Sequence, residues 1–568
     1  ITGGSACGIF YGIQTLRQMI SQEGCCLPYT IIVDHPQLLH RGFYHDVTRG
    51  RIPTMDYLKK LVDRMAYYKL NQLQLYMEHT FMFRNFSEVW RDDTPLTAED
   101  ILELDAYCRK RHVELVPSIA CFGHLYKVLR TRTYGHLCEL DDMAEEPFGF
   151  VDRMKHHTLD VSNPESMQLV KSMIDEFMPL FTSDYFNICA DETFDLGKGK
   201  STKLAEEKGT QRMYLDFVRE LCEYVVSKGK APMFWGDIIC DFPEAVKELP
   251  EETICLNWGY DADWPADSTR KLSEAGARLY NCPGVSGWDQ LVNQIRVSYE
   301  NISRMCRYAY EYGAEGVLNT DWGDCGHINH PEFSLPGMVY GAVFSWNQEI
   351  PEFEDINRQI SKVAYGDDTE TFVSLIARIS ESWRFTWRNA VDWLEQGGLD
   401  QQKNEMADMA GAISDDKTAA RNQRNVPEVV LASEEEYRVA IVELEEIKAE
   451  LYRSVIHLSE AQKGQISAYL IALQGMILLQ KMGIVLAKNE KAGGQTMGRN
   501  DSVNERERAE GDGQKGVQGI PIRERQHLAS ELENWLYDYK KLWRSTSRES
   551  ELYRIQNVIC RYADWLRG

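Results

Sequence analysis

Short apolar stretches alternate with amphipathic helical stretches through the first half of the chain. The segment "TMDYLKKLVDRMAYYKL" places Leu58, Leu61, Val62 and Met65 on one helical face, and Thr54 precedes them as a suitable N-cap. The next segment, "QLQLYM", has the two-residue alternation of a strand. The same succession continues through "VELVPSIA", "YFNICA", "APMFW", "TICLNW", "ARLYNC" and "AEGVLNT". This alternation predicts a parallel sheet covered by helices.

Eight such strand–helix units lie between residues 37 and 350. Eight units predict a closed (β/α)8 TIM barrel, with the active site at the carboxyl ends of its strands. The alternative is an open, doubly wound sheet, which usually has a Gly-rich phosphate-binding turn after its first strand. The corresponding segment here, "HDVTRGRIP", is not such a turn. We therefore predict an α/β fold with residues 37–350 as the catalytic barrel.

The regions on either side of the barrel have different patterns. Residues 1–36 contain a helical spacing from Ile9 to Ile20 and a strand-like "YTIIVDHP", which together indicate the remnant of a small α+β domain. Residues 351–568 are predicted to form a helical C-terminal region. A polar, Gly-rich insertion near 488–516 interrupts it, and its composition predicts a mobile segment.

Composition restricts the possible partners. The chain has 63 Lys and Arg against 87 Asp and Glu, giving a net charge of −24, and this argues against general binding of nucleic acid or anionic membranes. No apolar run reaches the roughly 18 residues that a membrane-spanning helix needs. The 14 cysteines are scattered without metal-ligand spacing, so we expect buried reduced thiols and a cytoplasmic protein. Export remains an alternative, because the chain begins at Ile1 and its own N-terminus can lie further upstream.

Acidic and aromatic residues gather at the predicted strand ends. Tryptophan faces stack on pyranose rings, and carboxylates bind hydroxyls or transfer protons, so this set is typical of a sugar site. A metal site is the competing use of His and Asp at a barrel mouth, but the histidines come from different strands. We therefore predict no metal and no cofactor. The residues at or near strand ends are Arg41, Asp46, Glu78, His79, His124, Asp191, Glu192, Trp235, Asp237, Trp258, Tyr280, Trp322 and Asp324.

With these residues assembled, the chain resembles the family 20 glycoside hydrolases, the β-N-acetylhexosaminidases, over about residues 5–350. "GIFYGIQTLRQMI" is similar to the helix ahead of the family's barrel, and "RGFYHDVTRGRIP" to its first strand. "ADET" stands where the family has its Asp-Glu pair, and "WGD", "NWG", "YNC" and "TDWGD" stand at the later strand ends. The order and spacing of these pieces carry the resemblance.

The resemblance implies substrate-assisted catalysis, in which the substrate's 2-acetamido oxygen attacks the anomeric carbon. It implies that Glu192 is the general acid and then the base, and that Asp191 orients the acetamido group of an oxazolinium intermediate. The other implied roles are a bond from Tyr280 to the acetamido oxygen, walls formed by Trp235, Trp258 and Trp322, support of Glu192 by His124, and binding of the outer hydroxyls by Arg41 and Asp324. Glu78 is a further substrate-binding candidate, with a structural role as its alternative. Asp46 and Asp237 are predicted to cap loops or orient neighbours.

The sequence departs from the commonest family pattern in three places. The motif His-x-Gly-Gly-Asp-Glu is replaced by "NICADE", an acid two residues after the strand-seven Tyr is replaced by Cys282, and the strand-eight Glu is replaced by Asp324. These changes surround the sugar hydroxyls and bear on substrate preference. The predicted partner is a glycan with a terminal N-acetylhexosamine, and the C-terminal helices pack on the barrel or form a homodimer. The alternatives are a hydrolase of a modified acetamido sugar and a non-catalytic sugar-binding protein.

Overall fold

The computed structural model describes residues 1–24, 26–141, 143–144, 147–398, 429–492, 517 and 519–568. Eight parallel strands follow one another in the order β3-β2-β1-β8-β7-β6-β5-β4. A parallel bridge between Ser118 and Asn187 joins the two ends of this order, so the sheet closes into the predicted barrel. The strands are β1 (His40–Asp46), β2 (Gln72–Tyr76), β3 (Glu114–Val116), β4 (Tyr185–Asn187), β5 (Ala231–Trp235), β6 (Ile254–Trp258), β7 (Arg278–Cys282) and β8 (Gly316–Asp321).

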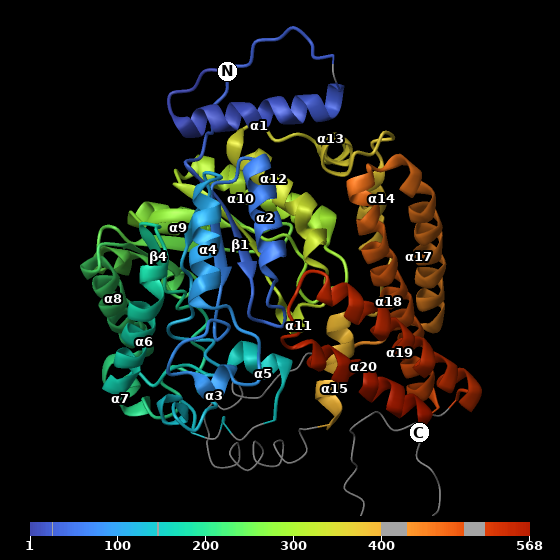
Figure 1. Cartoon of the computed structure of the whole chain (residues 1–568). Helices are drawn as coiled ribbons and strands as arrows, with labels where there is room; N and C mark the ends of the chain where they lie inside the picture. The colour runs from blue at the N-terminus through green and yellow to red at the C-terminus, as the bar shows by residue number, and fades with distance from the viewer. Residues whose placement is uncertain (25, 142, 145–146, 399–428, 493–516, 518) are drawn as a thin grey trace, which may run out of the picture.

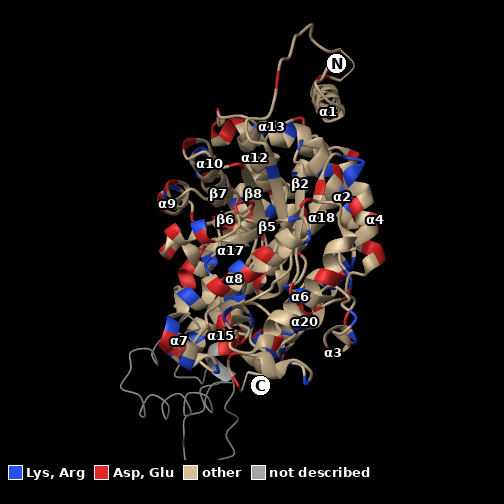
Figure 2. Cartoon of the chain, turned by 90° about the vertical axis from the view of Figure 1, so that its left-hand side faces the viewer, with Lys and Arg blue, Asp and Glu red and all other residues tan. Residues whose placement is uncertain are grey.

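Helices surround the barrel, and acidic and basic residues are interspersed along them (Figure 2). Thr54 caps the first of them, and Thr97 and Asp100 form a capping box, as the sequence predicts. The short helix predicted near 243–248 is a 3₁₀ helix, Pro243–Glu248. The helices are α2 (Met55–Tyr67), α3 (Ser87–Trp90), α4 (Ala98–Arg109), α5 (Phe150–Lys155), α6 (Pro164–Phe177), α7 (Thr202–Lys208), α8 (Thr210–Ser227), α9 (Asp267–Ala275), α10 (Ile295–Glu311), α11 (Asp324–His327) and α12 (Leu335–Trp346).

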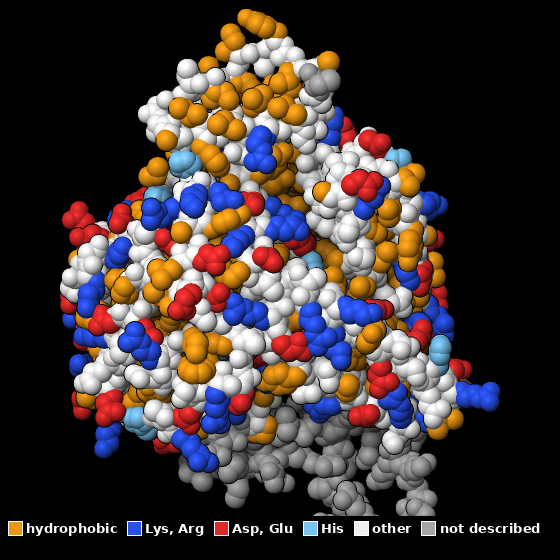
Figure 3. All heavy atoms as spheres, viewed as in Figure 1, with side chains coloured by type: hydrophobic (Ala, Val, Ile, Leu, Met, Phe, Trp, Pro, Cys, Tyr) orange, Lys and Arg blue, Asp and Glu red, His pale blue; other side chains and the backbone are white. Residues whose placement is uncertain are grey.

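Helix α1 (Ala6–Glu23) lies across the amino-terminal end of the barrel, at the top of Figure 1. Its apolar stripe remains partly exposed, with Ile9 42% and Ile20 49% accessible, and apolar side chains gather on this end of the surface (Figure 3). The strand predicted in "YTIIVDHP" is wrong: residues 29–36 lie outside any strand and make no ladder with a neighbour. A strand needs a partner for its backbone groups, and none lies beside these residues in the described part of the chain. The assignment of 1–36 to an α+β domain stays a prediction.

The helical C-terminal region stands beside the barrel (Figure 1). Helix α18 (Glu460–Lys491) is long and apolar enough to cross a membrane by length and composition alone, but 72% of its most apolar window is buried. It packs against α17 (Glu434–Ser454) and α19 (Ile522–Arg544). This packing explains its hydropathy as that of a core helix. The predicted insertion falls partly on the end of α18, and residues 493–516 lie outside the described residues. The helices are α13 (Phe353–Tyr365), α14 (Phe372–Ile379), α15 (Trp387–Gly398), α17 (Glu434–Ser454), α18 (Glu460–Lys491), α19 (Ile522–Arg544) and α20 (Leu552–Arg567).

Arg51, in the loop after β1, fastens these helices to the carboxyl end of the barrel. Its guanidinium is fully buried and donates to the carbonyl oxygen of His327 at 2.8 Å, to Ser547 Oγ at 3.1 Å and to the Tyr539 hydroxyl at 3.0 Å. The same group lies 3.9 Å from the centre of the Trp543 ring. Because Ser547, Tyr539 and Trp543 all belong to the C-terminal region, one side chain links it to two loops of the barrel.

We expect Arg51→Met to lower the free energy of unfolding by about 3 kcal/mol, because it leaves buried acceptors without a donor. Denaturant unfolding followed by tryptophan fluorescence measures the change. Lys541→Met is the control: Lys541 is 60% exposed on α19, so its replacement should change stability by less than about 0.5 kcal/mol. Equal stability of the two variants would contradict the role of Arg51.

Candidate active site

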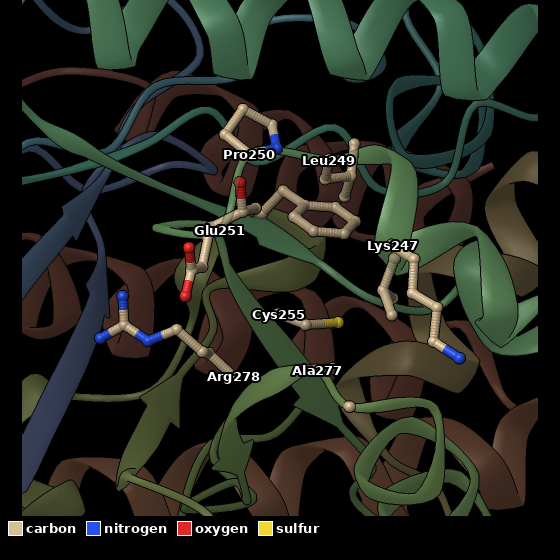
Figure 4. Close-up of a pocket in the computed structure, with 11 residues that line it drawn as sticks. Lys247, Leu249, Pro250, Glu251, Cys255, Ala277 and Arg278 are labelled. Carbon is tan, nitrogen blue, oxygen red and sulfur yellow. The ribbon is translucent and has the colours of Figure 1, made fainter.

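The predicted acidic and aromatic residues other than Tyr280 lie at the carboxyl ends of the strands. A separate cavity of about 400 Å³ lies at the other end of the barrel, where Thr253 and Arg278 precede or begin β6 and β7. Figure 4 shows Lys247, Glu251 and Arg278 around it. Because the catalytic residues of such barrels lie at the carboxyl ends, this cavity is not the candidate site.

The backbone leading into the acid pair is left-handed at most positions. Cys189, Ala190 and Glu192 have φ values of 56°, 66° and 46°. Left-handed backbone costs a non-glycine residue about 1–2 kcal/mol, so the surroundings must hold it. The Trp235 backbone N–H donates to the Cys189 carbonyl at 2.9 Å, and the Tyr214 hydroxyl donates to the Ala190 carbonyl at 3.0 Å. Cys189 and Ala190 thus occupy conformations that the Gly-Gly of the commoner motif adopts without strain.

This turn orients the two carboxylates differently. Asp191 is buried with 7% exposure, whereas the Glu192 side chain keeps 28% exposure. The Glu192 backbone N–H donates to Asp237 Oδ2 at 3.1 Å, so Asp237 orients its neighbour as predicted. Gly123 lies against the backbone of the acid pair, and a Cβ at this position would be 2.7 Å from the Asp191 carbonyl oxygen. The loops after β3 and β4 therefore meet in close backbone contact at the acid pair.

His124 lies between the two carboxylates. Its Nε2 is 3.5 Å from Asp191 Oδ2 and 3.3 Å from Glu192 Oε2. Burial alone would lower the pKa of His124, but the charge of Asp191 and the nearby carboxylate of Glu192 outweigh it and raise the pKa to about 10. The imidazole is therefore a cation at neutral pH, and it offsets the repulsion between two adjacent acids.

An aromatic wall stands beside the acid pair. The ring centres of Trp235 and Trp322 are 5.7 Å apart, and Tyr44 contacts both rings edge-on at 5.1 Å. Trp258 stacks on Tyr260 at 5.2 Å. The Trp322 Nε1–H donates to the Tyr260 hydroxyl at 2.8 Å, which joins the two halves of the wall. The three predicted tryptophans therefore lie on one side of the barrel mouth.

Arg49 and Asp324 form the polar end of the mouth. Arg49 Nη1 donates to Asp324 Oδ1 at 2.8 Å, and its Nε donates to Glu78 Oε1 at 3.3 Å. The guanidinium also lies 5.0 Å from the Trp322 ring centre. Asp324 keeps 21% exposure, whereas Glu78 is 2% exposed. Asp324 therefore faces the mouth with Arg49, and Glu78 lies beneath Arg49 as its ion-pair partner.

Arg41, the arginine selected from the sequence, does not lie in this site. It is the second residue of β1, five residues before Asp46, or about 16 Å along a strand. Its guanidinium donates to the carbonyls of Leu38, Leu39 and Lys69 at the amino-terminal end of the barrel. Arg49, in the same quoted motif, is the arginine that follows the strand and reaches the mouth.

Tyr280 also lies at the amino-terminal end, so it cannot contact a sugar at the mouth. Its ring stacks on His40, the first residue of β1, with centres 5.2 Å apart. Gly316, the first residue of β8, makes room for it, since a Cβ there would be 3.2 Å from the Tyr280 ring. Tyr280 therefore fills the lower layer of the barrel core. The tyrosine at the mouth is Tyr260, two residues beyond Trp258 in "NWGY".

Sequence reasoning also missed Asp289, which lies in the loop after β7. Its Oδ2 is 3.1 Å from Arg388 Nη1 on α15, and burial and the charge of Asp324 raise its pKa to about 6. The influence of Asp324 on it indicates that this carboxylate belongs to the surroundings of the polar end. The only signal for it was "GWDQ", an acid after an aromatic residue beyond the strand end.

One group of side chains has the ligand spacing of a metal site. His79, Asp93 and Glu551 bring ligand atoms within 4.8 Å of one another. Lys127 Nζ, however, lies 3.0 Å from Asp93 Oδ2 and 2.8 Å from Glu551 Oε1. The lysine supplies the positive charge that balances these carboxylates, so the donor set fits an ion-pair cluster better than a cation site.

Comparison with known proteins places the barrel among glycosidases. Residues 39–286 match the family model described as glycosyl hydrolase family 20, catalytic domain. A lacto-N-biosidase of Bifidobacterium bifidum is 22% identical over 403 residues, which are 66% of this chain and 34% of that protein. Human hexosaminidase D is 24% identical over 224 residues, or 38% of this chain and 44% of that protein. The chain thus spans less than half the length of these two relatives.

Solved structures share the fold. A chitobiase of Flavobacterium johnsoniae aligns with 98% of this chain and 83% of its own, with a TM-score of 0.53 and 15% identity. A β-N-acetylhexosaminidase of Bacteroides fragilis aligns with 62% of this chain and 76% of its own, with a TM-score of 0.51 and 19% identity. The first of these alignments extends over the C-terminal helices as well as the barrel.

The raised pKa of His124 makes stability depend on pH. The folded pKa of about 10 exceeds the ordinary value of about 6.5, so the stabilisation is full below about pH 6.5 and is lost as the pH rises through 10. Between pH 7 and 9, we expect the unfolding free energy of the wild type to fall by about 1.4 kcal/mol per pH unit more than that of His124→Gln. Urea unfolding at each pH measures this difference, and parallel curves would contradict a charged His124.

Proposed function

Because the chain belongs to glycosyl hydrolase family 20, we propose that it is an exo-acting, retaining β-N-acetylhexosaminidase that removes terminal β-linked GlcNAc or GalNAc. The observation that carries the proposal is the arrangement of Asp191, His124 and Glu192 beside the tryptophan wall. A binding protein needs the wall but has no use for a proton donor held beside it. The natural substrate would be a glycan or glycoconjugate with a terminal N-acetylhexosamine.

In the proposed first step, the substrate's own acetamido oxygen attacks the anomeric carbon while the glycosidic bond breaks. Glu192, the more exposed acid, protonates the leaving oxygen. Asp191 accepts a hydrogen bond from the acetamido N–H and stabilises the positive charge of the oxazolinium ring. In the second step Glu192 removes a proton from water, which adds to the anomeric carbon and reopens the ring. Two displacements at one carbon retain its configuration.

We propose that Tyr260 takes the role that the sequence had suggested for Tyr280. Its hydroxyl oxygen accepts the Trp322 Nε1–H, so the hydroxyl proton remains available for the acetamido oxygen. The bond would hold that oxygen toward the anomeric carbon, and Trp235, Trp258 and Trp322 would enclose the acetamido methyl and the sugar ring.

Arg49 and Asp324 would bind the hydroxyls at the non-reducing end of the sugar. Both side chains belong to one ion pair, so they present donors and acceptors in a fixed geometry. A subsite closed by this pair accepts a terminal sugar, which supports exo action. The similarity to a lacto-N-biosidase makes a lacto-N-bioside the second substrate to test.

The cytoplasmic location and the possible homodimer stay predictions. Cys108, Cys121 and Cys189 are free thiols buried in the barrel, as reducing surroundings would allow.

Glu192→Gln should reduce release of p-nitrophenol from the β-GlcNAc and β-GalNAc glycosides by at least about 100-fold, because the amide can neither donate nor accept the transferred proton. The thiazoline analogue of the oxazoline intermediate should inhibit the wild type. The ratio of the two wild-type rates gives the sugar preference. A wild type that binds GlcNAc but cleaves neither glycoside nor the lacto-N-bioside would identify a sugar-binding protein instead.

Arg49→Lys should lower kcat/KM by about 100-fold, because a lysine cannot reproduce the two-sided contact of the guanidinium with Asp324 and Glu78. Tyr280→Phe, at the opposite end of the barrel, should leave kcat/KM within about threefold of the wild type. Steady-state kinetics on the same glycosides compare the two. The reverse order of effects would restore Tyr280 to the site and remove Arg49 from it.

A further inference from the structure

A buried row of charges runs from the loop before the last helix of the chain to Arg49. Glu551, in the loop before α20, is 2% exposed and forms an ion pair with Arg153 Nη1. Arg153, on α5, is 3% exposed, and its Nη2 lies 3.7 Å from Glu78 Oε2. Glu78 then accepts the Arg49 Nε–H at 3.3 Å. Carboxylate and guanidinium alternate along the whole row.

The two ends of the row belong to different parts of the molecule. Arg49 lies in the loop after β1, whereas Glu551 lies 502 positions later, in the C-terminal region. Arg153 also donates to the carbonyl oxygen of Thr48 at 2.7 Å, one residue before Arg49. The Glu551 backbone N–H in turn donates to the Gly50 carbonyl at 3.2 Å. The C-terminal loop therefore contacts the residue after Arg49, and its ion-pair partner Arg153 contacts the residue before it.

Charge balance determines what Glu551 does for the row. Its carboxylate is shared by Arg153, by Lys127 at 2.8 Å and by Arg554 at 3.3 Å. If Glu551 lost its charge, Arg153 would keep Glu78 as its nearest buried carboxylate and would compete for it with Arg49. Burial alone would raise the pKa of Glu78, but the neighbouring His79 ring at 3.6 Å and the charges of Arg153 and Arg49 lower it to about 2, so Glu78 stays ionised and available to both arginines.

From these contacts we propose that Glu551 is a positioning residue for the sugar-binding site: by neutralising Arg153 it leaves Glu78 to Arg49 and fixes the guanidinium that faces Asp324. The helical C-terminal region thereby takes part in substrate recognition. This inference rests on the proposed function, because it assumes that Arg49 binds the terminal sugar.

The test is steady-state kinetics of Glu551→Gln in the full chain on the p-nitrophenyl β-GlcNAc glycoside. We expect KM to rise about tenfold while kcat changes by less than threefold, because Glu192 and Asp191 are untouched. Glu549→Gln is the matched control: Glu549 lies two residues away, is 58% exposed and pairs with Arg544. It should leave both constants unchanged. A KM for Glu551→Gln within twofold of the wild type would overturn the proposal.

Coupling to Arg49 separates positioning from a general structural role. If Glu551 acts through Arg49, Glu551→Gln should add less than twofold to the KM of Arg49→Lys. If it only stabilises the fold, the two effects on KM multiply, and the proposal fails. Should Glu551→Gln not fold, Arg153→Lys carries the same test, because it keeps the charge but cannot reach Glu551, Glu78 and Thr48 together. Absence of turnover in the wild type would instead count against the proposed function.

Discussion

Two neighbouring carboxylates at one strand end repel each other, and the site depends on how that repulsion is met. His124 reduces this repulsion, because its cationic ring lies 3.5 Å from Asp191 and 3.3 Å from Glu192. The ring reaches this position because the loop after β3 contacts the turn after β4 through Gly123, where a side chain would not fit. The backbone of this turn is left-handed at Cys189, Ala190 and Glu192. Hydrogen bonds from neighbouring elements hold it in that conformation. Charge compensation and backbone strain are thus parts of one arrangement.

At the polar end of the mouth the charges are reversed: a buried cation is stabilised by surrounding carboxylates. Arg49 is a buried cation, and it is stable there because Asp46, Glu78 and Asp324 surround it. Arg153 and Glu551 extend the same alternation of charges into the C-terminal region, and Arg51 fastens that region to two loops of the barrel. The helices beside the barrel are therefore connected to the residues at the barrel mouth, both through hydrogen bonds and through charge.

Periodicity predicted the barrel well because its strands and helices each bury one face, and that requirement is written into local sequence. The caps at Thr54, Thr97 and Asn163 were predictable for the same reason, since each needs only its own next three residues. The strand expected in "YTIIVDHP" failed because its composition suits a strand but no partner strand lies beside it. The local pattern sets the tendency of a segment to form a strand, but pairing with another strand depends on the tertiary structure.

The sequence by itself determined the barrel, because its strands and helices have recognisable periods. It also determined that Asp191, Glu192, Trp235, Trp258 and Trp322 lie at strand ends, because each of them ends or follows a recognisable strand. Only the tertiary structure decided between Arg41 and Arg49 and between Tyr280 and Tyr260. Both choices turn on which end of a strand a side chain occupies and which way it points, and a pattern of apolar residues is the same at both ends. Contacts between residues far apart in the chain, such as Glu551 with Arg153, leave no local signal, because charge pairing depends on distance in space.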